Sequence, residues 1–194
     1  MFANRFTALL DANVLVPALE RNIILSLAEA DLFRPRWSKP ILAETSSAIC
    51  RILNDAQRPD AEAAADRAVV NMRLSFPDAE VEGFEGLMAA FSDLPDPKDR
   101  HVIAAAVETR ATVIVTDNLR DFPSHITARH GIEAQTGDAF IANAIDLDPR
   151  IAQRALVKML ERLRNPVLDI ATIVSKLESR GRLLSADQIL RLID

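Results

Sequence analysis

Four acidic residues have the side-chain chemistry for a shared cation site: Asp11, Glu44, Asp99 and Asp117. Several carboxylates in one poorly solvated site repel each other, so such a site requires protons or cations. Carboxylate oxygens suit Mg²⁺ or Mn²⁺ better than zinc. Two such ions, about 3.5–4 Å apart, activate water and stabilise the leaving oxygen when a phosphodiester is hydrolysed. The residue types therefore predict hydrolytic chemistry at a divalent-cation site, provided that the fold brings the acids together.

The elements that must position these acids are strands alternating with helices. Apolar and β-branched runs predict strands over residues 6–10, 32–37, 79–81, 112–116 and 132–135. Apolar residues at helical spacing predict helices over residues 17–30, 38–53, 60–76 and 84–91, from residue 96 onward, and over 137–145. This alternation predicts an α/β fold with a parallel sheet covered by helices on both faces.

Beyond residue 145 the pattern is helical only, with helices expected over residues 149–164, 168–179 and 185–192. We therefore expect two domains, residues 1–145 and a helical C-terminal extension of residues 146–194. An apolar stripe would be costly to expose, so the extension is expected to pack on the domain or on a partner. The stripe consists of Leu156, Met159, Leu160 and Leu163.

Topology predicts that the four acids meet. In right-handed parallel units, a helix that leads into a strand starts at the edge where the strands end. Asp11 and Asp117 follow predicted strands at that edge. Asp99 lies in the first turn, and Glu44 in the second turn, of helices that start there. An acid at the carboxyl end of a central strand is also the usual ligand position of open α/β folds.

Each acid also has a structural interpretation. Asp99 could form a helix-capping pair with Asp96, which is as good an explanation as a cation site. Glu44 could lie on a solvated helix edge, and Asp117 could be an ordinary turn residue. Asn13 could be a turn residue or could hold Asp11 by a hydrogen bond, and we favour the hydrogen bond.

Composition narrows the class of protein. The chain has 194 residues, 49% of them apolar, a formal net charge of −5 and a single cysteine, Cys50, expected as a small core residue within a helix. One cysteine excludes an internal disulfide and a cysteine-based zinc site. The acidic balance argues against gripping nucleic acid by bulk charge. No signal peptide or membrane-spanning run is evident, and we expect a soluble cytoplasmic protein with no membrane contact.

Other catalytic classes find no support in the sequence. There is no Gly-x-Ser-x-Gly elbow, no P-loop and no Gly-x-Gly-x-x-Gly motif. No histidine pair has metal-ligand spacing. His101 is expected to be exposed or merely packed, and His125 and His130 fall in a predicted loop.

Three blocks of sequence carry a resemblance to a known family. They are Leu10-Asp11-Ala12-Asn13-Val14-Leu15, then the segment 96–106 that begins Asp-Pro-Lys-Asp-Arg-His, and then the segment 115–123 that reads Val-Thr-Asp-Asn-Leu-Arg-Asp-Phe-Pro; residues 36–44 fit between them. Over residues 6–145 the chain resembles the PIN-domain family of metal-dependent ribonucleases, which includes the VapC-type toxins. The resemblance implies a three-layer α/β/α fold with a central parallel sheet and an acidic cluster that holds Mg²⁺ or Mn²⁺.

The family's acidic positions carry over to Asp11, Glu44 and Asp99. The fourth position is open. Alignment favours Asn118, chemistry favours Asp117, and Asp121 is a third option. Asn13 and Arg100 are expected beside the site, and Lys98, Arg100 and Arg120 are either phosphate contacts or solvated charges.

The resemblance implies a divalent-metal-dependent ribonuclease, an endonuclease that acts as a toxin held in check by a cognate antitoxin protein. We expect RNA as its substrate and a homodimer as its assembly. The first alternative is a catalytically inactive PIN-like scaffold that binds RNA or protein. The second is a haloacid-dehalogenase-type phosphatase, ranked last because that family requires an Asp at the position of Asn13.

Overall fold

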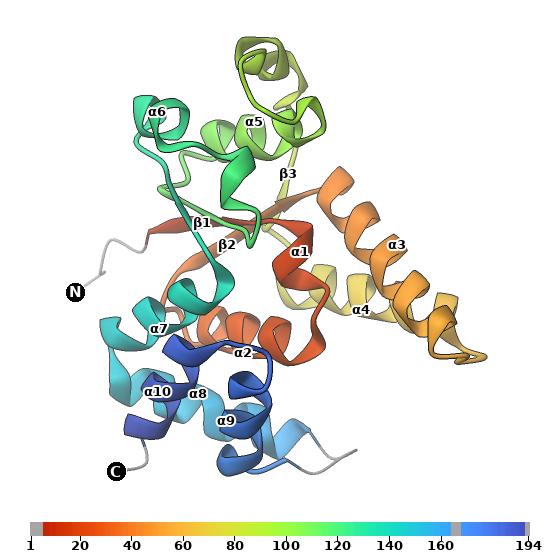
Figure 1. Ribbon diagram of the computed structural model, residues 1–194, viewed down its shortest axis with the longest axis vertical. Coiled ribbons are helices and arrows are strands. Elements are labelled where there is room, and N and C mark those ends of the chain that lie inside the picture. Colours follow the sequence, from red (N-terminus) through yellow and green to blue (C-terminus); the bar gives the residue numbers. More distant parts are fainter. Residues whose placement is uncertain (1–5, 164–167, 193–194) are drawn as a thin grey trace. The chain divides into compact units, whose positions relative to one another are not determined.

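The computed structural model describes residues 6–163 and 168–192, which fall into two compact units (Figure 1). The sheet unit comprises Phe6–Pro17 and Pro35–Gln135. The helical unit comprises Ala18–Arg34 and the described part of Thr136–Asp194. The boundary expected between residues 145 and 146 remains a prediction.

A five-stranded sheet with the order β3-β2-β1-β4-β5 organises the sheet unit. β1 pairs with β4, β4 with β5, and β2 with β3, all in parallel. The predicted α/β class with a central parallel sheet and a C-terminal helical extension is therefore confirmed. The strands are β1 (Thr7–Leu10), β2 (Arg34–Ser38), β3 (Glu80–Val81), β4 (Val113–Val115) and β5 (Glu133–Gln135).

The central position of β1 sets the location of the candidate site. Leu9 and Leu10 are fully buried, as are Ile114 and Val115 of β4, because both faces of a parallel sheet are covered. Leu10 lies opposite Val115 in the register. The residues that follow these two strands therefore lie side by side at one edge of the sheet.

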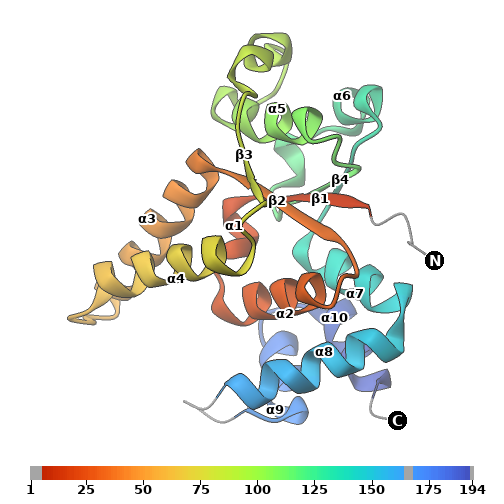
Figure 2. The same cartoon turned by 180° about the vertical axis from the view of Figure 1, so that it is seen from behind.

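The helices of the sheet unit begin where the sequence provides caps. Ser38 caps the N-terminus of α3 by accepting a hydrogen bond from the amide of Ile41. α5 is buried on nearly every side, as its uniformly apolar sequence predicts, and α3 lies alongside α4 (Figure 2). These helices are α1 (Ala12–Leu15), α3 (Lys39–Asp55), α4 (Ala61–Ser75), α5 (Arg100–Glu108) and α6 (Ser124–Thr127), with 3₁₀ turns at Glu85–Phe91, Pro97–Asp99, Leu119–Asp121 and Ala128–His130.

The helical unit joins α2 to the C-terminal helices. α2 packs against α8 and α7, and α10 packs against α7 and α9. Leu156 and Met159 are buried, so the prediction that the extension packs on the rest of the chain is confirmed. The predicted helix end at Arg164 lies outside the described residues. The helices are α2 (Ala18–Glu29), α7 (Gly137–Leu147), α8 (Pro149–Arg162), α9 (Ile170–Glu178) and α10 (Leu183–Arg191).

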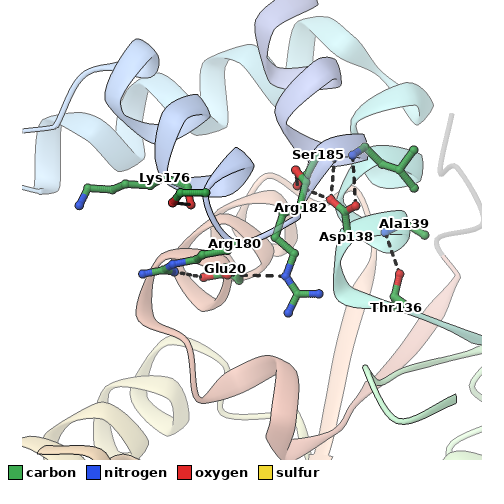
Figure 3. Close-up of polar contacts among 10 residues, drawn as sticks. Glu20, Thr136, Asp138, Ala139, Lys176, Arg180, Arg182 and Ser185 are labelled. Carbon is green, nitrogen blue, oxygen red and sulfur yellow. Dashed lines mark hydrogen bonds and ion pairs between the residues drawn. The ribbon is translucent and has the colours of Figure 1, made fainter. Parts of the chain in front are cut away.

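Two acids anchor the segment between α9 and α10 (Figure 3). Glu20 of α2 is buried and lies 2.7 Å from Arg180 and 3.8 Å from Arg182. Asp138, in the first turn of α7, accepts hydrogen bonds from the backbone amide and the hydroxyl of Ser185. The amide of Ser185 lies in the first turn of α10, where backbone amides have no partner within the helix, and Asp138 supplies one. The segment between α9 and α10 is therefore fixed to α2 by Glu20 and to α7 by Asp138.

Several element boundaries differ from the sequence-based prediction. The second strand begins two residues later than expected, and the helix expected from residue 96 opens with a 3₁₀ turn before α5 starts at Arg100. Two short helices, α1 and α6, were not predicted. Cys50 lies in α3 as expected, but it is half-buried at the unit's surface rather than in the core. Among the described residues, no helix is long and apolar enough to cross a lipid bilayer.

Candidate functional site

Asp11 follows β1 directly and its side chain is held in three directions. Its Oδ1 accepts a hydrogen bond of 2.7 Å from the amide of Ala12, which makes Asp11 the N-cap of α1. Its Oδ2 accepts bonds from Asn13 Nδ2 at 2.8 Å and from Thr116 Oγ1 at 2.7 Å. The carboxylate is therefore fixed in place before any ligand arrives.

Asn13 and Thr116 connect the ends of β1 and β4. Asn13 donates to the Thr116 hydroxyl at 2.9 Å, and its Oδ1 accepts a bond from the amide of Asp117 at 3.0 Å. The Thr116 hydroxyl also accepts a bond from the amide of Asn118 at 3.1 Å. Asn13 thus forms the hydrogen bond to Asp11 that was favoured from the sequence. Thr116 is fully buried and performs a positioning role that the sequence analysis did not assign to it.

Glu44 reaches the site from α3 and has a partner that was not predicted. His101 Nε2 lies 3.1 Å from Glu44 Oε1, and the histidine side chain is only 10% exposed, whereas Glu44 is 52% exposed. The ring nitrogen donates, since an ionised carboxylate only accepts. His101 is therefore neither exposed nor merely packed. Its Nδ1 is buried and has no hydrogen-bond partner among the described residues.

The pKa of Asp11 is raised above its ordinary value, mainly because burial disfavours the carboxylate, and the negative charge of Glu44 adds to this. Hydrogen bonds from Thr116 and Ala12 act in the opposite direction. Glu44 therefore lies close enough to Asp11 for the two charges to interact. This is the proximity that the topology of the sheet predicts.

Asp99 lies in a negatively charged environment. Its pKa is raised to about 7, first by burial and then by the negative charges of Asp11, Asp121 and Asp96. Asp96 accepts a bond from the amide of Lys98, whereas Asp99 makes no side-chain capping bond to α5. Of the pair considered from the sequence, Asp96 is the cap, and Asp99 is left facing other acids.

The three candidates for the fourth position lie in different surroundings. Asp121 interacts with Asp99 through charge and a side-chain hydrogen bond, and Asn118 donates from Nδ2 to Asp121. Asp117 is exposed, and its backbone amide donates to Asn13 Oδ1 at 3.0 Å. The structure thus groups Asn118 and Asp121 with Asp99. The catalytic assignment of all three remains a prediction.

The three basic residues considered from the sequence differ in their surroundings. Arg100 donates to the backbone carbonyl of Ser92 at 3.2 Å, so its guanidinium is engaged with the loop that follows the Glu85–Phe91 turn. Lys98 and Arg120 are exposed. A role in substrate binding remains a prediction for each of them.

Carboxylate oxygens are the donors that hard divalent cations prefer, and Asp11 and Asp121 each repel Asp99 in a way that such a cation would relieve. The donor chemistry therefore fits Mg²⁺ or Mn²⁺. Within the described part of the chain, however, no three acidic, histidine or cysteine side chains already converge tightly enough to hold a metal ion. The acids are close enough to interact by charge, but they are not preassembled as a closed set of ligands.

Comparisons with known proteins give two family matches. The PIN-domain family matches residues 7–120, and the VapC50 C-terminal domain matches residues 137–191. A Mycobacterium tuberculosis protein named "Putative ribonuclease VapC50" is 37% identical to this chain over 84 residues, which are 43% of this chain and 48% of that protein. The matched region thus spans about half the length of that relative. No solved structure matches the chain.

Proposed function

Since the chain belongs to the PIN-domain family and is of the VapC type, we propose that it is a divalent-metal-dependent endoribonuclease. The observation that carries the proposal is the group of mutually repelling acids at the carboxyl edge of the sheet. A site that raises the pKa of Asp99 to about 7 costs stability, and such costs are concentrated where function requires them.

The proposed metal ligands are Asp11, Glu44, Asp99 and a fourth group. Asp117 was expected for the fourth role on chemical grounds. The charge interaction with Asp99 favours Asp121, with Asn118 as its hydrogen-bond donor. When bound, Mg²⁺ or Mn²⁺ supplies activation of water and stabilisation of the leaving oxygen in phosphodiester hydrolysis.

The rest of the network holds these acids ready. Thr116 and Asn13 fix one oxygen of Asp11, which leaves the carboxylate little rotational freedom. His101 holds Glu44 from the side of α5, so this exposed side chain is kept at the sheet edge. Because the Glu44 side chain is 52% exposed, it is well suited to orient a water molecule or to accept its proton.

In this proposal the substrate is cytoplasmic RNA, and a cognate antitoxin protein inhibits cleavage as in VapC-type pairs. A homodimer remains part of the proposal and is testable by sedimentation. The competing proposal is a scaffold that binds RNA or protein without cleaving it. The open arrangement of the acids, with no preassembled metal cluster among the described residues, is the observation that favours this alternative.

The experiment uses the purified full chain, freed of any co-purified partner, and a mixed pool of single-stranded RNA. We expect cleavage with Mn²⁺ or Mg²⁺ and none with EDTA. The Asp99→Asn variant, treated identically, should not cleave and serves as the control for contaminating nucleases. Intact RNA in every lane would favour the scaffold, whereas equal cleavage by the wild type and the variant would indicate a contaminant.

A further inference from the structure

The polar face of α8 carries a regular row of positive charge, which we name the basic stripe: Arg150, Arg154, Lys158 and Arg162. Residues four apart on an α-helix lie on one face with about 6 Å of axial rise between them. The opposite face is buried, with Ala152, Leu156 and Met159 packed inward. The four cations are therefore held on one side of a helix whose rotation is fixed by its core contacts.

A pocket of about 300 Å³ lies along this stripe, between α8 and α2. α8 contributes Arg154, Lys158 and Arg162 to its lining, and α2 contributes Ser26 and Glu29. Arg162 donates to Glu29 at 2.7 Å and to the Ser26 hydroxyl at 3.1 Å, which positions its guanidinium at the pocket wall. The acid that lines the pocket is thus already paired, and the other two cations give the pocket a positive charge.

The remaining members of the stripe lack internal compensation. Arg150, Arg154 and Lys158 form no ion pair with any residue of ranges 6–163 and 168–192. Like charges four residues apart on a helix repel each other. α8 contains four basic residues and one acidic residue, Glu161, in a chain whose formal net charge is −5. An anionic ligand would relieve this repulsion.

We propose that the basic stripe binds successive phosphates of single-stranded RNA. This inference rests on the proposed function, because RNA is the polyanion that the acidic centre would cleave. Without a bound cation the acids of that centre repel phosphate, so binding of RNA in EDTA depends on positive charge elsewhere in the chain. Guanidinium groups match phosphate oxygens with paired donors. The pocket lining contains no aromatic side chain for base stacking, so the proposed contact is with the phosphate groups.

The test compares two double variants with the same change of formal charge. Arg154→Gln with Lys158→Gln removes the uncompensated charges of the pocket. Arg51→Gln with Lys176→Gln is the matched control, because both residues are exposed, both lie on helices and neither belongs to the stripe. Binding of a fluorescent single-stranded RNA to the full chain is measured by anisotropy in EDTA, over a range of salt concentrations. Circular dichroism checks that each variant is folded.

We expect the stripe variant to bind RNA about tenfold more weakly and its log–log salt slope to fall by about 1.4, since each lost phosphate contact on a single strand removes about 0.7. The control should match the wild type. Equal affinity and slope in the two double variants would overturn the proposal. Stripe-dependent binding of polyglutamate, without stripe-dependent binding of RNA, would instead assign the surface to an acidic protein segment.

The outcome is separable from that of the proposed function. Binding in EDTA does not require cleavage, so the basic stripe can fail this test while Mn²⁺-dependent cleavage persists. Conversely, absence of cleavage with stripe-dependent RNA binding would overturn the nuclease and leave an RNA-binding protein.

Discussion

Asp11 and Glu20 are both buried acids, but their surroundings have opposite charge. Glu20, in the helical unit, is 4% exposed and is paired with Arg180 and Arg182. Asp11, in the sheet unit, is 7% exposed; the charge of Glu44 raises the pKa of Asp11, and the charge of Asp11 raises the pKa of Asp99. Hydrogen bonds from neutral groups, Thr116 and Asn13, hold the Asp11 carboxylate in place of arginine.

This difference separates a structural acid from a candidate functional one. A buried carboxylate with arginine partners is complete without a ligand, and removing it leaves cations unpaired. A buried carboxylate that faces other acids lacks positive charge, and a divalent cation can supply it. Neutralising each acid tests this distinction, because stability and cleavage should respond in opposite ways at the two positions.

The largest expected effect is that of Asp11→Asn on cleavage, a loss of about 100-fold or more because a proposed metal ligand is removed. In EDTA we expect the melting temperature to remain nearly unchanged. Neutralisation removes the cost of burying a charged group and the repulsion by nearby acids. Asparagine, however, cannot accept all three hydrogen bonds that Asp11 accepts, so the two effects oppose each other. The stabilisation gained on adding Mn²⁺ should shrink. A variant that melts much lower in EDTA, yet gains as much from Mn²⁺ as the wild type, would make Asp11 a structural residue.

Glu20→Gln should show the opposite pattern. We expect a loss of about 2 kcal/mol in the free energy of unfolding, because charged hydrogen bonds to a buried group are broken. The loss in stability should be smaller than for a fully buried ion pair, because Arg180 is 46% exposed and water can solvate its guanidinium once Glu20 is neutral. Cleavage at 25 °C should be retained.

The matched control is Asp187→Asn, which breaks the exposed pair with Arg191 and should change stability by less than about 0.5 kcal/mol. Denaturant unfolding measures both variants. Equal effects at the two positions would remove the distinction between a buried ion pair and an exposed one in the helical unit.

The fourth acid provides a sharper contrast within the site. Asp121→Asn should reduce the cleavage rate and the affinity for Mn²⁺ by about tenfold each, since Asp121 interacts with Asp99. Asp117→Asn should change both by less than about twofold, because the network uses the backbone amide of Asp117. Kinetics and calorimetric titration with Mn²⁺ compare the two. The reverse ranking would restore Asp117 to the fourth position.

Local sequence patterns predicted most of the sheet unit. The apolar run before Asp11 and the β-branched run before Thr116 were sufficient to place β1 and β4, because buried parallel strands have that composition. The short helix α1 was missed, since Ala12–Leu15 is as apolar as the strand before it and only the cap on Asp11 distinguishes the two. The sequence also indicated that Asp11 ends a central strand, which the strand order confirms.

Contacts between distant residues could not be predicted in the same way. His101 is 57 positions from Glu44, and Thr116 is 105 positions from Asp11, so no local spacing signals either hydrogen bond. The ion pair of Glu20 could not be predicted either, because its partner Arg180 lies 160 positions further along the chain. One signal could have identified Thr116. It is a threonine directly after a β-branched strand, and the neighbouring strand ends at an acid to which its hydroxyl can donate.

The smallest expected effect concerns Asp99 and pH, and it tests the repulsion itself. Asp99 is suited to this test because it makes no capping bond that asparagine would lose. Its pKa in the folded protein is about 7, against 3.8 for the unperturbed side chain. Between these values the folded state binds more protons than the unfolded state, so the stability of the metal-free protein falls as pH rises from about 4 to 7.

Asp99→Asn removes this loss. In EDTA at pH 8 the variant should melt about 2–4 °C above the wild type, equivalent to about 1 kcal/mol once solvent screening of a half-exposed group is taken into account. At pH 4 the two proteins should melt within about 1 °C of each other, because Asp99 is then protonated in the folded state. Saturating Mn²⁺ at pH 8 should reverse the ranking, since a cation would stabilise only the protein that keeps the carboxylate. An advantage of equal size at both pH values would mean that asparagine improves packing or helix geometry, and that the acids of the sheet edge do not repel one another enough to require a cation.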